Sequence, residues 1–217
     1  MNGPLWLSLE IASIATLLTT LLALPLASLV SHRRLFVLDA LLTTPLVLPP
    51  TVLGYFLLVV MGNHTVIGRA WQAVFGSSLV FTTTGIVFAA VITSLPLVLQ
   101  ATRAAIEGVD VTLVNAARTL GANRFKTYTR ITLPLASRGM CAGIVLGFAR
   151  ALGDFGVTMM VGGNLPGETR TASLAIYDAF IADRATEALH LSLMLAGFSI
   201  VLVSVATLLG RRPHAHA

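Results

Sequence analysis

Two oppositely charged residues inside an apolar stretch are the first candidates for chemistry. Arg150 and Asp154 lie four residues apart, so both side chains share one helical face and can form an ion pair. Charges at membrane depth are costly and are retained for a purpose. We therefore expect either a structural ion pair between helices or a pair that lines or gates an anion path. The other acidic candidates, Glu10 and Asp39, lie near the ends of apolar stretches, so no further acidic residue at depth supports a proton relay.

The sequence lacks the usual motifs of hydrolytic and metal chemistry. Its five histidines form no HExxH motif, and no GxSxG motif is present. Lys126 is the sole lysine and follows Phe125, so the Gly-Lys of a phosphate-binding P-loop cannot occur. Cys141 is the sole cysteine, and His214 and His216 in the tail are expected to be inert. We predict no catalytic residue, metal site or cofactor in this chain, so active transport needs an ion gradient or a separate ATPase subunit.

The elements that must position these residues are membrane helices. Of 217 residues, 56% are hydrophobic and 11% charged, with a mean hydropathy of +0.87. Soluble domains average about 45–50% apolar and about 25% charged residues, so a cytosolic enzyme, a disordered regulator and a nucleic-acid binder are all excluded. The fold class is an all-α, polytopic membrane bundle. About five stretches, within one domain at 5–211, are long enough to span a bilayer: 5–30, 36–61, 79–100, 139–161 and 189–210.

The distribution of basic residues predicts the orientation. Ten lysines and arginines fall on one side of these spans and three on the other. Because basic residues are enriched in cytoplasmic loops, we expect the N-terminus outside and the C-terminus in the cytoplasm. Pro45, Pro49 and Pro50 must interrupt the second span, and such interruptions are tolerated where protein or water satisfies the freed carbonyls. We therefore expect this span to face a partner helix or a cavity.

The long cytoplasmic loop between spans three and four, residues 101–138, is the most informative segment. Asp110 can cap a short helix that Gly121 would end in a left-handed conformation. Asn123 can cap a second helix, which Pro134 is expected to stop. These helices predict a compact projection from the membrane. From the residues alone, it could equally dock on another protein or rest on anionic lipid headgroups.

The spacing within this loop carries a resemblance. Asn115-Ala116-Ala117, Gly121, and then Ile131, Leu133 and Pro134 resemble the EAA signature of ABC importer permeases, with Asn115 where the family usually has Glu. Four further strings resemble the molybdate branch of that family, a neighbour of the sulfate permeases. They are LVLPPTVLGY at 46–55, EGVDV at 107–111, FARALGDFG at 148–156 and NLPGETRT at 164–171.

The resemblance implies the permease subunit of an ATP-driven importer in the cytoplasmic (inner) membrane. Family members combine two permease subunits with two ATP-binding subunits and an extracytoplasmic oxyanion-binding protein. Because five helices hardly enclose an aqueous path, we expect the two permease subunits to be a homodimer. The implied substrate is molybdate, with tungstate, sulfate and thiosulfate as alternatives. A gradient-driven secondary transporter and a membrane scaffold are the other classes of protein considered.

The chemistry of the residues and the resemblance together give particular residues expected roles. The residues expected to couple the chain to the ATP-binding subunit are Asn115, Ala116, Ala117, Gly121, Ile131, Leu133 and Pro134. The residues expected to line the pathway or its gate are Pro49, Pro50, Gly54, Arg150 and Asp154. The hydroxyls of Thr82, Thr83 and Thr84 could face an oxyanion, although threonines in membrane helices mostly bond their own backbone.

Overall fold

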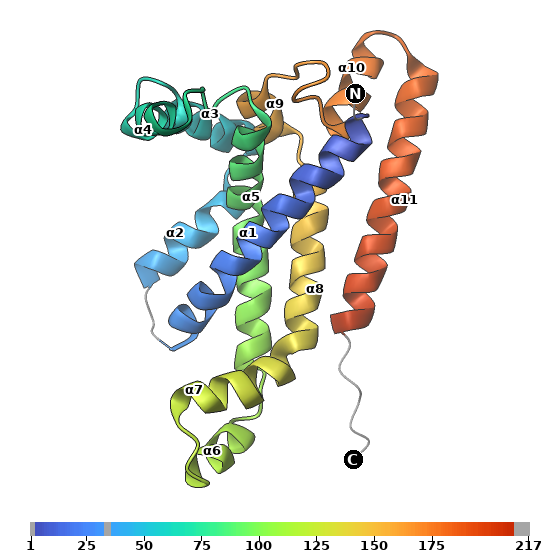
Figure 1. Cartoon of the computed structure of the whole chain (residues 1–217). Helices are drawn as coiled ribbons and strands as arrows, with labels where there is room; N and C mark the ends of the chain where they lie inside the picture. The colour runs from blue at the N-terminus through green and yellow to red at the C-terminus, as the bar shows by residue number, and fades with distance from the viewer. Residues whose placement is uncertain (1–2, 33–35, 211–217) are drawn as a thin grey trace.

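A computed structural model of the chain describes residues 3–32 and 36–210, and the regular structure within these ranges is entirely helical (Figure 1). In chain order the elements are α1 (Pro4–His32), α2 (Phe36–Val47), α3 (Pro50–Met61), α4 (Val66–Phe75), α5 (Thr83–Glu107), α6 (Val111–Thr119), α7 (Arg124–Thr127), the π-helical turn η1 (Tyr128–Thr132), α8 (Leu133–Leu152), α9 (Gly156–Gly162), α10 (Ala172–Ile181) and α11 (Ala185–Gly210).

Four helical stretches are long and apolar enough to cross a membrane. They are α1, α5, α11 and the continuous stretch from α7 to α8. The α2–α3 pair makes a fifth if it is taken as one span. The prediction of an all-α bundle with about five spans is therefore confirmed. His214, His216 and four of the arginines used to predict the orientation lie outside the described residues.

Two predicted spans are broken, the first at prolines where we expected an interruption and the second where we did not. The span at 36–61 consists of α2 and α3, bent by 115° at Leu48 and Pro49. Pro49 and Pro50 lack N–H groups, so the ladder of backbone hydrogen bonds stops there, whereas Pro45 lies within α2 without ending it. The span at 139–161 is not one continuous helix, contrary to our expectation, because α8 ends at Leu152 and α9 is a separate helix.

Helix α5 is the centre of the bundle, and α11 lies at its edge (Figure 1). In the most apolar window of each helix, 61% of the α5 residues are buried but only 6% of the α11 residues. Three clusters of buried apolar side chains all include α5: one with α1 and α8, one with α3 and α9, and one with α1 and α8 nearer the other end. A buried hydrogen bond of 3.0 Å between the Thr19 and Ser94 hydroxyls also joins α1 to α5.

A row of glycines lets α8 approach α5 closely. A Cβ atom at Gly139 would lie 2.8 Å from the Ala105 Cβ, and one at Gly143 would lie 2.5 Å from the Ala101 Cβ. Gly147 meets Val98 in the same way one turn further on. Apolar surface gives little drive for association in lipid, so close van der Waals packing through small residues holds the two helices together.

Candidate functional site

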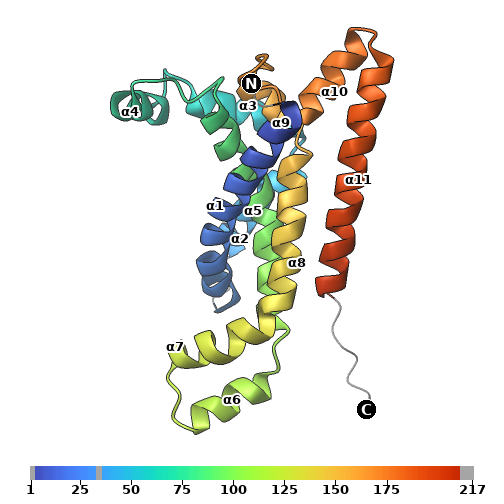
Figure 2. The same cartoon turned by 45° about the vertical axis from the view of Figure 1, so that its right-hand side comes forward.

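The segment between α5 and α8 projects from one end of the bundle. Helices α6 and α7 extend beyond the ends of α5 and α8, on the side where α11 ends, in both views (Figures 1 and 2). We call this projection, residues 108–132, the knob. A cavity of about 570 Å³ lies between α6, α7 and the end of α5, and its lining includes Arg118, Arg124 and Tyr128.

Both predicted N-caps of the knob are confirmed. The Asp110 carboxylate accepts a hydrogen bond of 2.8 Å from the Thr112 N–H at the start of α6. The Asn123 side chain accepts one of 2.8 Å from the Lys126 N–H at the start of α7. Hydrogen bonds from the side chain and then the backbone of Thr112 lower the pKa of Asp110 below its usual range. Its carboxylate is therefore ionised at neutral pH, as a helix N-terminus favours.

Gly121 forms the turn between the two helices of the knob. Its φ of +86° lies in the region that favours glycine. The Gly121 N–H donates to the Arg118 carbonyl and the Ala122 N–H donates to the Ala117 carbonyl, each at 3.0 Å. This pair of bonds is a Schellman motif, which satisfies the last carbonyls of α6. The predicted left-handed glycine is confirmed.

The small residues of α6 are not equally accessible. The side chains of Asn115 and Ala116 are exposed, whereas Ala117 is buried against the rest of the knob. Within this chain, therefore, Asn115 and Ala116 form the exposed part of the predicted docking surface, whereas Ala117 is buried beneath it.

Pro134 does not stop the second helix of the knob, contrary to our expectation. Helix α7 continues through the π-turn η1 into α8, and Pro134 lies at the beginning of α8. The Leu133 N–H bonds the carbonyl of Tyr128, five residues back, so the hydrogen-bond ladder has already changed register before the proline. Ile131 and Leu133, on either side of this change, are partly buried. Helix α7 of the knob is thus continuous with α8 through the π-turn, although it lies at an angle to α8 in both views (Figures 1 and 2).

Arg150 and Asp154 form the predicted ion pair, at 2.9 Å, but at the end of a helix rather than within one. Arg150 lies in the last turn of α8, and Asp154 follows in the link to α9. The Asp154 carboxylate also accepts hydrogen bonds from the N–H and hydroxyl of Thr158, at 3.2 and 3.0 Å. The Ser173 hydroxyl of α10 donates to the Asp154 carbonyl at 2.8 Å. These bonds begin a new helix at α9, which explains why α8 ends earlier than predicted.

Burial divides this pair unequally. The Asp154 side chain is 2% exposed, whereas that of Arg150 is 35% exposed. The carboxylate is therefore fully engaged within the chain, while the guanidinium keeps an accessible surface. In Figure 1 the end of α8 that carries the pair lies below the upper ends of α1 and α11.

The proline element and the ion-pair element meet. A Cβ atom at Gly54 of α3 would lie 2.9 Å from the Met160 Cβ of α9, and one at Gly156 would lie 2.8 Å from the Pro50 Cβ. Pro50 and Gly54 therefore pack directly against the helix that Asp154 begins. The structure thus places next to each other two motifs, at 46–55 and 148–156, that are far apart in the sequence.

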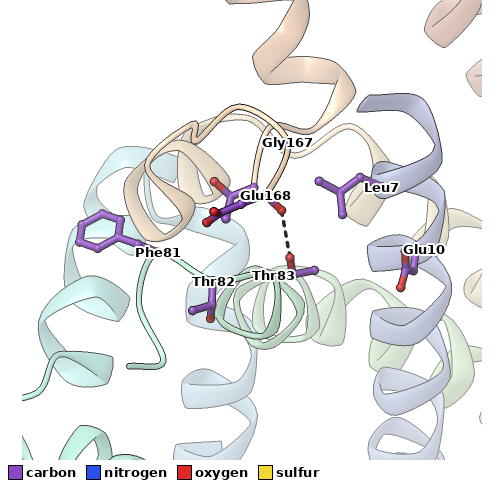
Figure 3. A pocket seen from close by; sticks show the side chains of 8 residues that line it. Leu7, Glu10, Phe81, Thr82, Thr83, Gly167 and Glu168 are labelled. Atoms are coloured by element: carbon purple, nitrogen blue, oxygen red, sulfur yellow. Dashed lines mark hydrogen bonds between the residues drawn. The ribbon is translucent and has the colours of Figure 1, made fainter. Parts of the chain in front are cut away.

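Two of the three threonines at the start of α5 bond backbone groups, whereas the third, Thr84, is exposed. The Thr82 hydroxyl donates to the Leu79 carbonyl at 2.7 Å and accepts from the Gly85 N–H at 3.1 Å. The Thr83 hydroxyl donates to the Glu168 carbonyl at 3.1 Å, across a pocket of about 480 Å³ (Figure 3). Glu10 and Glu168 also line this pocket, and their negative charge makes it unsuitable for an oxyanion.

Sequence reasoning missed the glycine row of α8, together with Thr158 and Ser173. The row was readable as glycines at 139, 143 and 147 in an apolar stretch, the spacing of small residues at membrane helix contacts. No sequence signal joins Ser173 to Asp154, because that contact depends on the tertiary fold. Among residues 3–32 and 36–210, no group of three or more His, Cys, Asp or Glu residues could hold a metal ion.

Comparison with known proteins connects these features to a family. Residues 15–214 match the family described as binding-protein-dependent transport system inner membrane component. The molybdenum transport system permease protein ModB of Escherichia coli (strain K12) is 45% identical over 184 residues, which cover 82% of this chain and 80% of that protein. The ModB protein of Haemophilus influenzae is 40% identical over 206 residues, covering 94% and 89%, and that of Mycobacterium tuberculosis is 38% identical over 202 residues, covering 91% and 76%.

A solved structure supports the fold independently. The structure described as an amino acid ABC transporter with histidines superimposes with a TM-score of 0.66 at 20% identity, covering 97% of this chain and 92% of that chain. The chain therefore belongs to the family of binding-protein-dependent transport system inner membrane components, multi-pass permease subunits that work with an ATP-binding subunit and a substrate-binding partner.

Proposed function

We propose that this chain is the permease subunit of an ATP-driven importer that carries molybdate across the cytoplasmic membrane. The observation that carries the proposal is the knob, whose Schellman turn at Gly121 lies within a loop of EAA-type spacing at one end of the bundle. The names of the relatives, all molybdenum transport permeases at 38–45% identity, support the choice of substrate. Tungstate, sulfate and thiosulfate share the tetrahedral shape of molybdate and remain the substrates to be compared with it.

The knob is the proposed contact with the ATP-binding subunit, which binds and hydrolyses the ATP. Asn115 and Ala116 supply a surface of small, exposed side chains that permits close approach. Asn115 carries no charge where the family usually has a carboxylate, so this contact relies on shape and hydrogen bonds rather than on an ion pair. Because the knob continues into α8, movement of the ATP-binding subunit would be transmitted to the membrane helices as motion of a rigid body.

A homodimer would supply the complete pathway. About five spans hardly enclose an aqueous path, and a second copy related by a twofold axis would close one. The complex would then hold two permease subunits, two ATP-binding subunits and one extracytoplasmic oxyanion-binding protein. The knob, rich in basic residues, would lie in the cytoplasm with the C-terminus, and the N-terminus would lie outside.

Arg150 is the proposed anion-attracting group of the pathway. Its guanidinium keeps accessible surface, and its partner Asp154 is held by Thr158 rather than by solvent. Asp154 offsets part of the positive charge, so a dianion would be attracted without being trapped. Pro49, Pro50 and Gly54 would form the neighbouring broken-helix element, because α3 packs against α9.

The test is molybdate uptake into proteoliposomes that hold the whole complex. Uptake is compared with ATP inside the vesicles and with ATP outside them. ATP-dependent uptake that falls to background in Gly121→Asp, together with loss of co-purifying ATP-binding subunit, is the expected result. Competition by tungstate and by sulfate then ranks the substrates. Uptake driven by an ion gradient without the ATP-binding subunit would refute the proposal. Normal uptake by Gly121→Asp would remove the knob from the coupling role.

A further inference from the structure

Helix α4 is an amphipathic helix that the transport function leaves without a role. It lies at the end of the bundle opposite the knob and extends to its side in both views (Figures 1 and 2). The Thr65 hydroxyl caps its start by accepting from the Gly68 N–H, and Gly76 ends it with a φ of +68°. A helix of ten residues with both ends capped is a defined element rather than a loop.

The surface of α4 has three sectors. Gly68 is buried, and Trp71 packs toward the bundle, with its ring 5.7 Å from that of Phe88 in an edge-on arrangement. The second sector is apolar and exposed, and consists of Val66, Ile67 and Val74. The third sector is polar and exposed, and contains Arg69 and Gln72. Successive residues turn by 100°, so the exposed apolar and polar sectors lie on different sides of the helix.

The contact with α5 fixes the depth of α4. Phe88 lies five residues after the start of α5, which is about 7–8 Å along the helix at 1.5 Å per residue. Trp71 therefore lies close to the end of a membrane-spanning helix, where hydrocarbon gives way to headgroups. Interfacial helices bury their apolar face by about 5–10 Å at this boundary, and tryptophan is enriched there.

The chemistry of α4 favours lipid over a protein partner. A helix about 15 Å long presents only a small part of the ~800 Å² that each partner buries in a standard protein interface. Arg69 is the single charged residue of α4, and it lies on the polar sector, where a lipid phosphate would be found.

We propose that α4 is an interfacial anchor that lies in the outer boundary of the bilayer. Its apolar sector of Val66, Ile67 and Val74 enters the upper acyl region, while Arg69 and Gln72 face headgroup and water. The anchor holds the bent α2–α3 segment at a fixed depth, because α4 follows directly after α3.

Spin labels can test the two exposed sectors separately. In a Cys141→Ser background, which removes the sole cysteine, a label is attached at Val74→Cys or, as a matched control two residues away, at Gln72→Cys. The protein is reconstituted in vesicles of phosphatidylethanolamine and phosphatidylglycerol, and collision rates are measured with oxygen, which partitions into lipid, and with a water-soluble nickel chelate. The ratio of oxygen to nickel collisions is expected to be several-fold higher at position 74 than at position 72.

Three results would overturn the anchor. A water-like ratio at both positions would leave α4 in solution, and a lipid-like ratio at both would embed it fully. A label at position 74 shielded from both reagents would indicate a protein partner, such as a second copy of the chain. Val66→Cys and Arg69→Cys repeat the comparison if either of the first variants fails to fold.

Discussion

Replacement of Gly121 by alanine tests whether the backbone turn of the knob, rather than its composition, couples the chain to the ATP-binding subunit. The residue has a φ of +86°, and a Cβ atom built there would meet nothing within 4 Å. An alanine side chain therefore adds no clash, and its effect is confined to the backbone. Gly121→Asn adds a larger side chain, but asparagine adopts the left-handed region far more readily.

The magnitude follows from the left-handed conformation. Holding a residue with a Cβ there costs about 1–2 kcal/mol, which changes the ratio of closed to open turn by a factor of about 5–30. The Ala122 N–H reports this ratio, because it donates to the Ala117 carbonyl at 3.0 Å only while the turn is closed. We expect its hydrogen exchange to accelerate about 5–30-fold in Gly121→Ala and by less in Gly121→Asn.

Uptake by the same variants connects the turn to function. Gly121→Ala should lower ATP-dependent uptake and the yield of co-purified ATP-binding subunit, and Gly121→Asn should lower them less. Gly76→Ala is the matched control, because Gly76 is also left-handed, at a φ of +68°, with nothing within 4 Å of its Cβ position. It carries the same backbone cost at the end of α4, far from the knob, and should leave the yield of co-purified ATP-binding subunit unchanged.

Three outcomes would contradict this reasoning. Unchanged exchange of the Ala122 N–H in Gly121→Ala would mean that the turn bears no left-handed cost. Faster exchange with normal uptake would mean that the turn is present but does not couple. Equal loss of co-purified ATP-binding subunit in Gly76→Ala would assign the effect to general destabilisation.

Three further predictions concern the membrane part of the chain. Gly143→Ala should lower the stability in detergent by about 1–3 kcal/mol, because the added Cβ meets that of an alanine on α5. Gly197→Ala is the control: a Cβ atom built there meets nothing within 4 Å, so the thermal midpoint should change little. Thr19→Val should cost about 0.5–1.5 kcal/mol by removing a buried interhelical hydrogen bond of 3.0 Å, and an unchanged midpoint would show that this bond contributes nothing. Arg150→Ala should destabilise the protein, because it leaves the buried Asp154 carboxylate unpaired. The double variant Arg150→Ala, Asp154→Asn should regain stability but not uptake. Recovery of uptake in the double variant would mean that the pair is purely structural.

The features predicted correctly from the sequence are those fixed by local chemistry. The caps at Asp110 and Asn123 and the left-handed turn at Gly121 need only neighbours within a few residues, so their side-chain types were sufficient. Hydropathy likewise identified the apolar stretches, because each must satisfy its own backbone in lipid.

The features that were wrong depend on competition between distant or alternative contacts. Pro134 ends an ordinary helix, but here the π-turn at Tyr128–Thr132 moves the hydrogen bonds out of register before the proline is reached. The end of α8 could not be predicted from hydropathy, because apolar residues continue past Leu152. The new helix depends on hydrogen bonds to Asp154 from Thr158 and from Ser173 of α10. Hydropathy gives the length of an apolar stretch, but not the position at which a buried carboxylate ends one helix and begins another.

The glycine row gives a physical reason why the knob and the ion pair can act together. Gly139, Gly143 and Gly147 remove the side chains that would otherwise separate α8 from α5, so the two helices that flank the knob are packed backbone against side chain along their length. Dense packing of this kind leaves little room for local deformation and transmits displacement. On the proposed function, a movement applied to the knob would therefore be carried along α8 to Arg150 at its far end. Loosening this contact should thus weaken coupling even where the knob still binds its partner.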